Sequence, residues 1–207
     1  MELIIFDCDG TLVDSELLCN LAMEQQLAEI GFKADAKELT IEYRGVKLAK
    51  IMSSLEVRFS TTFPADFETE YRTKVLALFD EHLKANDGVI ELIESLTLPF
   101  CIASSAPRSK IERSLKVTGL DKYFKGNIFS AYDVGAWKPD PDLFLHAAKT
   151  MNVDPTKCYV VEDSPVGLQA ANRANMHCIY YAPEDNERSP LADTQVKHMS
   201  ELLGKLI

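Results

Sequence analysis

The sequence of 207 residues lacks a long hydrophobic run. No stretch approaches the roughly 18 consecutive apolar residues that a membrane-spanning helix needs, and Glu2 and Asp7 fall where a signal peptide would have a basic start and an apolar centre. Basic charge is also scarce, because 22 Lys and Arg stand against 32 Asp and Glu, for a net charge of −10. Such a surface repels nucleic-acid phosphates and anionic lipids. We therefore expect a cytoplasmic protein that binds neither nucleic acid nor membrane.

Cysteine and histidine are few and widely spaced. The 5 cysteines include no C-x-x-C pair, and the 4 histidines include no pair four residues apart. These absences argue against a disulfide framework and against a zinc site. Any bound metal is expected to have oxygen ligands.

Short apolar runs alternate with helix-like stretches in most of the chain. The runs predict buried strands at 3–6, 99–103, 128–131, 158–161 and 178–181. The apolar spacing predicts helices at 108–117, 141–151 and 165–174. Short strands that alternate with helices are typical of a parallel sheet with helices on both faces. We therefore expect a doubly wound α/β core.

The segment between the first two predicted strands is too long for an ordinary crossover. It contains helix-like stretches at 17–30, 47–58 and 66–83, and no convincing strand. These helices form either a large layer on one sheet face or a separate inserted domain. We favour an inserted domain at 15–83, with a core of 1–14 and 84–207, because ligands of open α/β sheets bind beside the carboxyl ends of strands.

Acidic pairs follow two of the predicted strands. Asp7 and Asp9 come directly after the first strand, and two desolvated carboxylates this close repel each other unless a cation or a shared proton lies between them. Glu162 and Asp163 follow a later strand, although acids also suit the start of the helix predicted there. Oxygen ligands, water and a substrate phosphate together suit Mg²⁺. The expected metal ligands are Asp7, Asp9, Glu162 and Asp163.

A hydroxyl pair and a lysine follow other predicted strands. Ser104 and Ser105 precede a helix, where hydroxyl and backbone N–H groups can hold a phosphate, although serine there is more often a simple helix cap. Lys138 lies in the proline-rich loop Gly135–Pro141, where a solvated lysine is the commoner case. The joint occurrence of these features at successive strand ends favours a phosphate site.

In this order and spacing, the motifs resemble those of the haloacid dehalogenase superfamily, in the branch of phosphatases and β-phosphoglucomutases with a helical cap after the first strand. The matching motifs are Asp7-x-Asp9-Gly10-Thr11, Ser104, Lys138 in Lys-Pro-Asp-Pro, and Glu162-Asp163 followed by Gly167. The resemblance covers essentially the whole chain. It implies a Rossmann-like core and a cap domain at 15–83.

The resemblance also implies a role for each matching residue. Asp7 would be the nucleophile and Asp9 the general acid and base. Ser104 and Lys138 would hold the transferring phosphoryl group, and Asp163 with Glu162 would complete the Mg²⁺ site. The expected partner is then a small phosphate ester, and the resemblance to bacterial phosphogluconate phosphatases implies a sugar phosphate or sugar-acid phosphate.

The choice between phosphatase and phosphomutase depends on the predicted cap. Mutases of this branch carry a histidine shortly after the D-G-T turn and an arginine after a Gly-Val pair, where this chain has Cys19 and Leu48. Water is therefore the favoured acceptor, and a phosphatase the favoured function. A mutase and a non-catalytic phosphate-binding module stay as alternatives. Arg44, Gly45 and Lys47 are expected to bind the far end of the substrate, and we expect a monomer.

Overall fold

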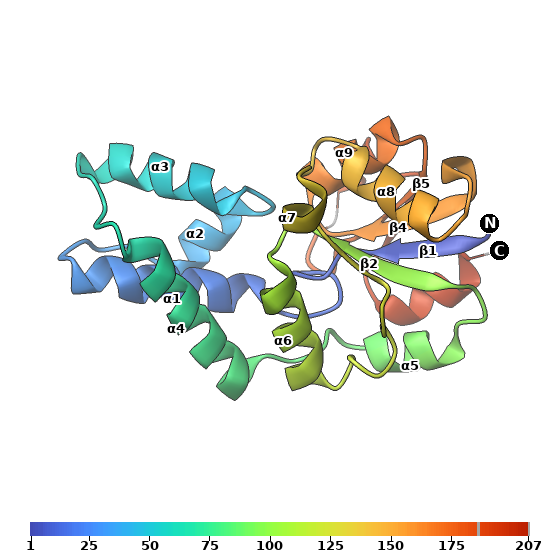
Figure 1. Cartoon of the computed structure of the whole chain (residues 1–207), viewed down its shortest axis with the longest axis horizontal. Helices are drawn as coiled ribbons and strands as arrows, with labels where there is room; N and C mark the ends of the chain where they lie inside the picture. The colour runs from blue at the N-terminus through green and yellow to red at the C-terminus, as the bar shows by residue number, and fades with distance from the viewer. Residues whose placement is uncertain (186, 207) are drawn as a thin grey trace. The chain divides into compact units, whose positions relative to one another are not determined.

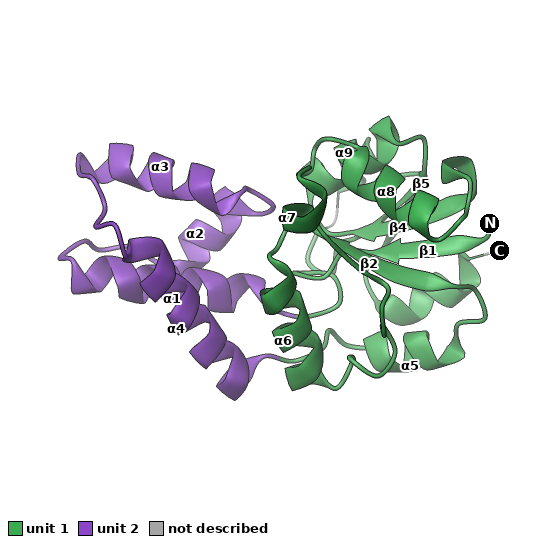
Figure 2. Cartoon of the chain, viewed as in Figure 1, with its two compact units in different colours: residues 1–13, 84–207 green, residues 14–83 purple. Residues whose placement is uncertain are grey.

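The computed structural model describes residues 1–185 and 187–206. Contacts within the chain divide it into two compact units (Figure 2). The α/β unit comprises Met1–Val13 and Lys84–Ile207, and the helical unit comprises Asp14–Leu83.

A sheet of six parallel strands forms the centre of the α/β unit, in the order β3-β2-β1-β4-β5-β6. The strands are β1 Leu3–Phe6, β2 Phe100–Ser104, β3 Ile128–Ser130, β4 Cys158–Glu162, β5 His177–Tyr181 and β6 Thr194–Val196. All four residues of β1 are fully buried, as expected for a strand with neighbours on both edges and helices on both faces. The predicted doubly wound parallel sheet is confirmed, whereas β6 was not predicted.

Helices cover both faces of this sheet (Figure 1). They are α5 Val89–Ser95, α6 Arg108–Thr118, α7 Ala131–Val134, α8 Asp142–Thr150 and α9 Pro165–Arg173, with 3-10 helices η1 Pro155–Lys157 and η2 Met199–Gly204. In Figure 1, α8 and α9 lie on one face, and α5 and η2 on the other. The predicted helices at 108–117, 141–151 and 165–174 are confirmed, and α5 and α7 were not predicted.

Alternate residues of β1 pack into different layers, because successive side chains of a strand point to opposite faces. Leu3 and Ile5 belong to a buried cluster that includes Phe144 of α8. Phe6 points to the opposite face of the sheet, where its ring makes an edge contact with the ring of Phe124. Each such apolar side chain contributes about 1.5–3 kcal/mol when it is fully buried. Packing on both faces fixes β1, and with it the start of the Asp7 loop.

The helical unit consists of α1 Glu16–Glu29, α2 Ala36–Tyr43, α3 Leu48–Phe59 and α4 Phe67–His82. Helix α1 packs against both α2 and α4. Asp35 caps α2 and accepts hydrogen bonds from the backbone N–H groups of Lys37 and Glu38. Three of these helices were predicted and α2 was not. Among all described residues, none of the helices has both the length and the apolar character needed to cross a membrane.

Candidate active site

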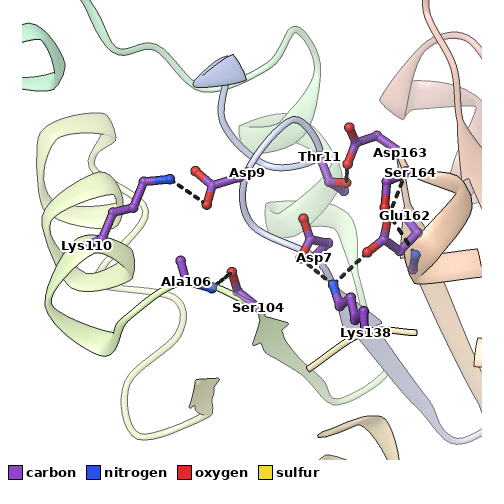
Figure 3. A network of polar contacts seen from close by, with 11 residues as sticks. Asp7, Asp9, Thr11, Ser104, Ala106, Lys110, Lys138, Glu162, Asp163 and Ser164 are labelled. Atoms are coloured by element: carbon purple, nitrogen blue, oxygen red, sulfur yellow. Dashed lines mark hydrogen bonds and ion pairs between the residues drawn. The ribbon is translucent and has the colours of Figure 1, made fainter. Parts of the chain in front are cut away.

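The carboxyl ends of β1, β2 and β4 meet at one edge of the sheet, because these three strands are parallel neighbours. Asp7 directly follows β1, while Ser104 and Glu162 are the last residues of β2 and β4. Strand register thus brings together residues that are up to 155 positions apart, from Asp7 to Glu162. Figure 3 shows the resulting network of polar side chains.

Three of the predicted metal ligands form a compact acidic cluster. Carboxylate oxygens of Asp7, Glu162 and Asp163 lie within 4.8 Å of one another, and all three side chains are buried. Buried carboxylates at this separation repel one another unless cations offset their charge. Carboxylate oxygen is also the ligand type that Mg²⁺ prefers, so the cluster fits a magnesium site. The Asp9 carboxylate is directed elsewhere, toward Lys110 (Figure 3).

Lys138 supplies one positive charge to this cluster. Its Nζ donates to Asp7 Oδ1 at 2.5 Å and to Glu162 Oε1 at 2.6 Å, and its side chain is only 4% exposed. Burial disfavours the ammonium charge, but the attraction of Asp7 and Glu162 outweighs burial and raises the pKa of Lys138. Lys138 therefore stays charged at neutral pH.

Asp7 experiences opposing influences on its ionisation. Burial raises the pKa of Asp7 to about 7, while the positive charge of Lys138 acts in the opposite direction. The nearby negative charge of Glu162 adds to the effect of burial in raising this pKa. One lysine thus only partly offsets the acids, which is the electrostatic reason to expect a further cation beside them.

Glu162 is held in place by the start of α9. Its Oε2 accepts hydrogen bonds from the backbone N–H and the hydroxyl of Ser164, both at 2.8 Å. Ser164 also caps α9 by accepting a hydrogen bond from Gly167 N at 3.1 Å. A Cβ atom on Gly167 would lie 1.9 Å from the Glu162 carboxyl group. Glycine at this position therefore makes room for the glutamate.

Gly10 and Thr11 hold Asp163 in place in a similar way. Thr11 Oγ1 donates to Asp163 Oδ1 at 3.0 Å, and both residues are buried. Gly10 has a φ of 75°, and a Cβ there would lie 2.3 Å from Asp163 Oδ2. The D-G-T sequence thus lets this loop pack closely against Asp163, which lies 152 positions after Thr11 in the sequence.

Ser104 is the last residue of β2, and Ser105 lies in the connection between β2 and α6. Ser104 is buried, and its Oγ accepts a hydrogen bond from Ala106 N at 3.2 Å. The alternative that a serine caps the helix is wrong, because Pro107 precedes α6 and makes no side-chain capping bond. Ser105 is half-buried. The phosphate-holding role of both serines stays a prediction.

Two residues of the network were not predicted from the sequence. Lys110 Nζ donates to Asp9 Oδ2 at 2.8 Å. Asn86 Nδ2 donates to the carbonyl oxygens of Gly10 and Thr11, at 2.9 Å and 2.8 Å. Neither residue belongs to a motif of its own, and both contacts join positions that are distant in the sequence.

The predicted substrate-binding residues Arg44, Gly45 and Lys47 belong to the helical unit, in the connection between α2 and α3. All three are exposed, and Gly45 has a φ of 72°. Contact between these residues and a substrate stays a prediction.

Known proteins resemble the chain over nearly its whole length. It is 36% identical over 206 residues to the 6-phosphogluconate phosphatase of Escherichia coli (strain K12), with 98% of this chain and 93% of the relative covered. It is 33% identical to the phosphorylated carbohydrates phosphatase of Thermotoga maritima, with 87% of this chain and 84% of the relative covered.

Solved structures also share the fold. A conserved haloacid dehalogenase-like protein of unknown function from Agrobacterium tumefaciens has a TM-score of 0.85 and 31% identity, with 100% of this chain and 97% of that chain covered. The model of the haloacid dehalogenase-like hydrolases matches residues 1–175. The resemblance found in the sequence is therefore confirmed, and the chain belongs to the haloacid dehalogenase-like hydrolase family.

Proposed function

We propose that the protein is a Mg²⁺-dependent phosphatase that hydrolyses a small organic phosphomonoester through an aspartyl-phosphate intermediate. The observation that carries this proposal is the meeting of Asp7, Lys138 and the acidic cluster at one edge of the sheet. A buried carboxylate beside a lysine and a candidate metal site is an arrangement suited to nucleophilic attack on a phosphate.

Asp7 begins the proposed reaction. A carboxylate oxygen of Asp7 attacks phosphorus, the bond from phosphorus to the ester oxygen breaks, and an aspartyl phosphate forms. Lys138, whose ammonium group already contacts Asp7, offsets negative charge on the phosphoryl oxygens. We propose that Ser104, the last residue of β2, and Ser105, which follows it, also bind the phosphoryl oxygens.

Asp9 moves the protons in this scheme. Its carboxyl group gives a proton to the departing alkoxide, which leaves as an alcohol. The resulting carboxylate then accepts a proton from the water that attacks the aspartyl phosphate. The bond between Asp7 and phosphorus breaks, and the products are inorganic phosphate and regenerated enzyme.

Asp7, Glu162 and Asp163 are the residues that would hold the metal. Bound Mg²⁺ would supply positive charge beside the phosphate and reduce its repulsion of the anionic nucleophile. Thr11 and Ser164 keep two of these carboxylates oriented by donating hydrogen bonds to them. For Asp9 we propose a backbone ligand role at most, because its side chain contacts Lys110.

A sugar phosphate or sugar-acid phosphate is the proposed substrate class. Support comes from the two relatives described above, which are named a 6-phosphogluconate phosphatase and a phosphorylated carbohydrates phosphatase. The cytoplasm, where such metabolites occur, is the proposed location.

The decisive experiment compares the wild type with Asp7→Asn. The wild type should hydrolyse phosphate monoesters when Mg²⁺ is present, and Asp7→Asn should fall to background while it remains folded, because the amide is nearly isosteric but a poor nucleophile. Mass spectrometry of acid-quenched reactions should find phosphate on Asp7. Phosphate trapped on another residue, or hydrolysis retained in Asp7→Asn, contradicts the proposal.

A further inference from the structure

Helix α6 places a lysine on the loop that follows β1. Lys110 Nζ lies 2.8 Å from Asp9 Oδ2, and the two residues are 101 positions apart in the sequence. Both side chains are mostly shielded, with 19% and 18% of their surfaces exposed. Figure 3 shows the Asp9 carboxylate turned toward α6, on the side opposite Glu162 and Asp163. The contact therefore sets the direction in which Asp9 points.

The position of Lys110 in its helix is unfavourable by itself. It lies in the first turn of α6, together with Arg108, and positive side chains at a helix N-terminus oppose the helix dipole. Arg108 is paired with Asp133 of α7 at 2.7 Å, and thus has a structural role between two helices. Lys110 reaches Asp9 instead. Lys110 thus does not stabilise the start of α6, but it contacts the Asp9 carboxylate. This combination indicates that Lys110 has a role in the site rather than in the stability of the helix.

We propose that Lys110 is a positioning residue that holds Asp9 in the orientation needed for proton transfer. The inference rests on the proposed function, in which Asp9 protonates the departing oxygen. Proton transfer needs a carboxyl group within hydrogen-bond distance of that oxygen, and the loop after β1 must therefore hold Asp9 still. The hydrogen bond from Lys110 Nζ to Asp9 Oδ2 restricts the rotation of this carboxyl group, and a protonated carboxyl group can still accept it. Helix α6 is itself anchored beside the sheet through its contact with β3.

Leaving groups of different basicity provide the test. An alkyl alcohol leaves poorly unless it is protonated, whereas 4-nitrophenolate leaves readily without a proton. Lys110→Met keeps the length of the side chain but removes its charge. We expect kcat/KM of Lys110→Met to fall about 10- to 100-fold for an alkyl phosphate such as a hexose 6-phosphate, and by less than about 3-fold for 4-nitrophenyl phosphate.

Three other variants make the result specific. Asp9→Asn should show the same dependence on the leaving group in stronger form, because it removes the acid itself. Lys110→Arg keeps a positive donor and should recover part of the lost kcat/KM for the alkyl phosphate. Lys116→Met changes an exposed lysine of the same helix and should match the wild type with both esters. Thermal unfolding of each variant checks that it is folded.

The failure of this inference differs from the failure of the proposed function. Equal losses with both esters, or no loss with either, overturn the positioning role of Lys110 while wild-type hydrolysis still supports the phosphatase. A wild type that hydrolyses neither ester with Mg²⁺, or an Asp7→Asn variant that stays active, overturns the proposed function itself. A selective loss with the alkyl ester together with recovery in Lys110→Arg supports both.

Discussion

Thr11 contacts the acidic cluster through a buried hydrogen bond to Asp163. Groups that orient a metal ligand typically change metal affinity about 10- to 100-fold when they are removed. We predict that Thr11→Val weakens Mg²⁺ binding by this amount, because valine matches the shape of threonine but cannot donate. The measurement is the Mg²⁺ concentration that gives half-maximal activity.

Thr11→Ser is the matched control for this prediction. Serine keeps the donating hydroxyl and loses only a methyl group, so its Mg²⁺ requirement should stay close to that of the wild type. If Thr11→Val binds Mg²⁺ as well as Thr11→Ser does, the hydrogen bond to Asp163 does not orient a metal ligand.

Gly167 has a steric role at the same site. Alanine would place Cβ 1.9 Å from the Glu162 carboxyl group, which must then move away from Lys138. We predict that Gly167→Ala destabilises the protein by about 1–3 kcal/mol, as overpacking usually does. We also expect kcat/KM to fall by about 10²-fold, because small displacements of catalytic groups have effects of this size. Denaturant unfolding and steady-state kinetics measure the two effects.

Gly204 provides a comparison for this substitution. It also lies in a helix, η2, and a Cβ there would meet nothing within 4 Å. Gly204→Ala should therefore leave both stability and kcat/KM close to wild-type values. Equal behaviour of the two alanine variants would show that the contact between Gly167 and Glu162 does not limit the site.

At the scale of elements, the loop after β1 is tied to the segment that begins the second part of the α/β unit. Asn86 donates two side-chain hydrogen bonds, to Gly10 and Thr11, and its backbone N–H donates to Leu12 at 3.0 Å. We predict that Asn86→Ala lowers stability by about 1–3 kcal/mol, since each lost hydrogen bond contributes about 0.5–1.5 kcal/mol. Because this loop carries Asp7 and Asp9, activity should fall more than the loss of folded protein explains.

Asn127→Ala is the control that distinguishes an effect on the loop after β1 from the general effect of removing an asparagine side chain. Asn127 also donates from its side chain to a backbone carbonyl, that of Phe100, at 3.4 Å and away from the Asp7 loop. This variant should keep wild-type kcat/KM. Comparable kinetic losses in both alanine variants would argue that Asn86 has no particular influence on the catalytic loop.

Two elements show why the sequence did not reveal the whole fold. Helix α2 has only eight residues, and its apolar stripe consists of little more than Leu39 and Tyr43, which is too short for a clear period. Strand β6 reads Thr-Gln-Val and pairs only with β5 at the sheet edge. Three residues are too few to show an alternating pattern, and the extended form of β6 depends on its pairing with β5. The strongly apolar strands β1 and β4 were by contrast evident from their sequence.

At the scale of the whole molecule, the sequence predicted which strand ends carry chemistry better than it predicted the network around them. Asp7 follows β1, and Ser104 and Glu162 end β2 and β4, so all three could be assigned to one sheet edge from the parallel topology alone. The partners Asn86 and Lys110 could not, because their contacts depend on how a connecting segment and the first turn of α6 lie against the Asp7 loop. No local pattern encodes such packing.

The acidic cluster also leads to a prediction for the stability of the whole protein. A ligand that binds only the folded state stabilises it by about 2.7 kcal/mol at 100 times its dissociation constant. In a protein of this size, each kcal/mol added to the free energy of unfolding raises the melting temperature by roughly 2–4 °C. We therefore predict that saturating Mg²⁺ raises the melting temperature by about 5–10 °C in differential scanning fluorimetry. The physical reason is that Mg²⁺ offsets the repulsion among Asp7, Glu162 and Asp163.

Asp163→Asn tests whether this shift originates at the cluster. Asparagine can still accept the hydrogen bond from Thr11 but removes one negative charge. Without metal, Asp163→Asn should therefore unfold at the same temperature as the wild type or higher, since the remaining acids repel each other less. With Mg²⁺, it should lose most of the melting-temperature shift, because a charged ligand is missing. A full Mg²⁺ shift in Asp163→Asn would assign the ion to another part of the molecule, and the absence of any shift in the wild type would reject the metal site.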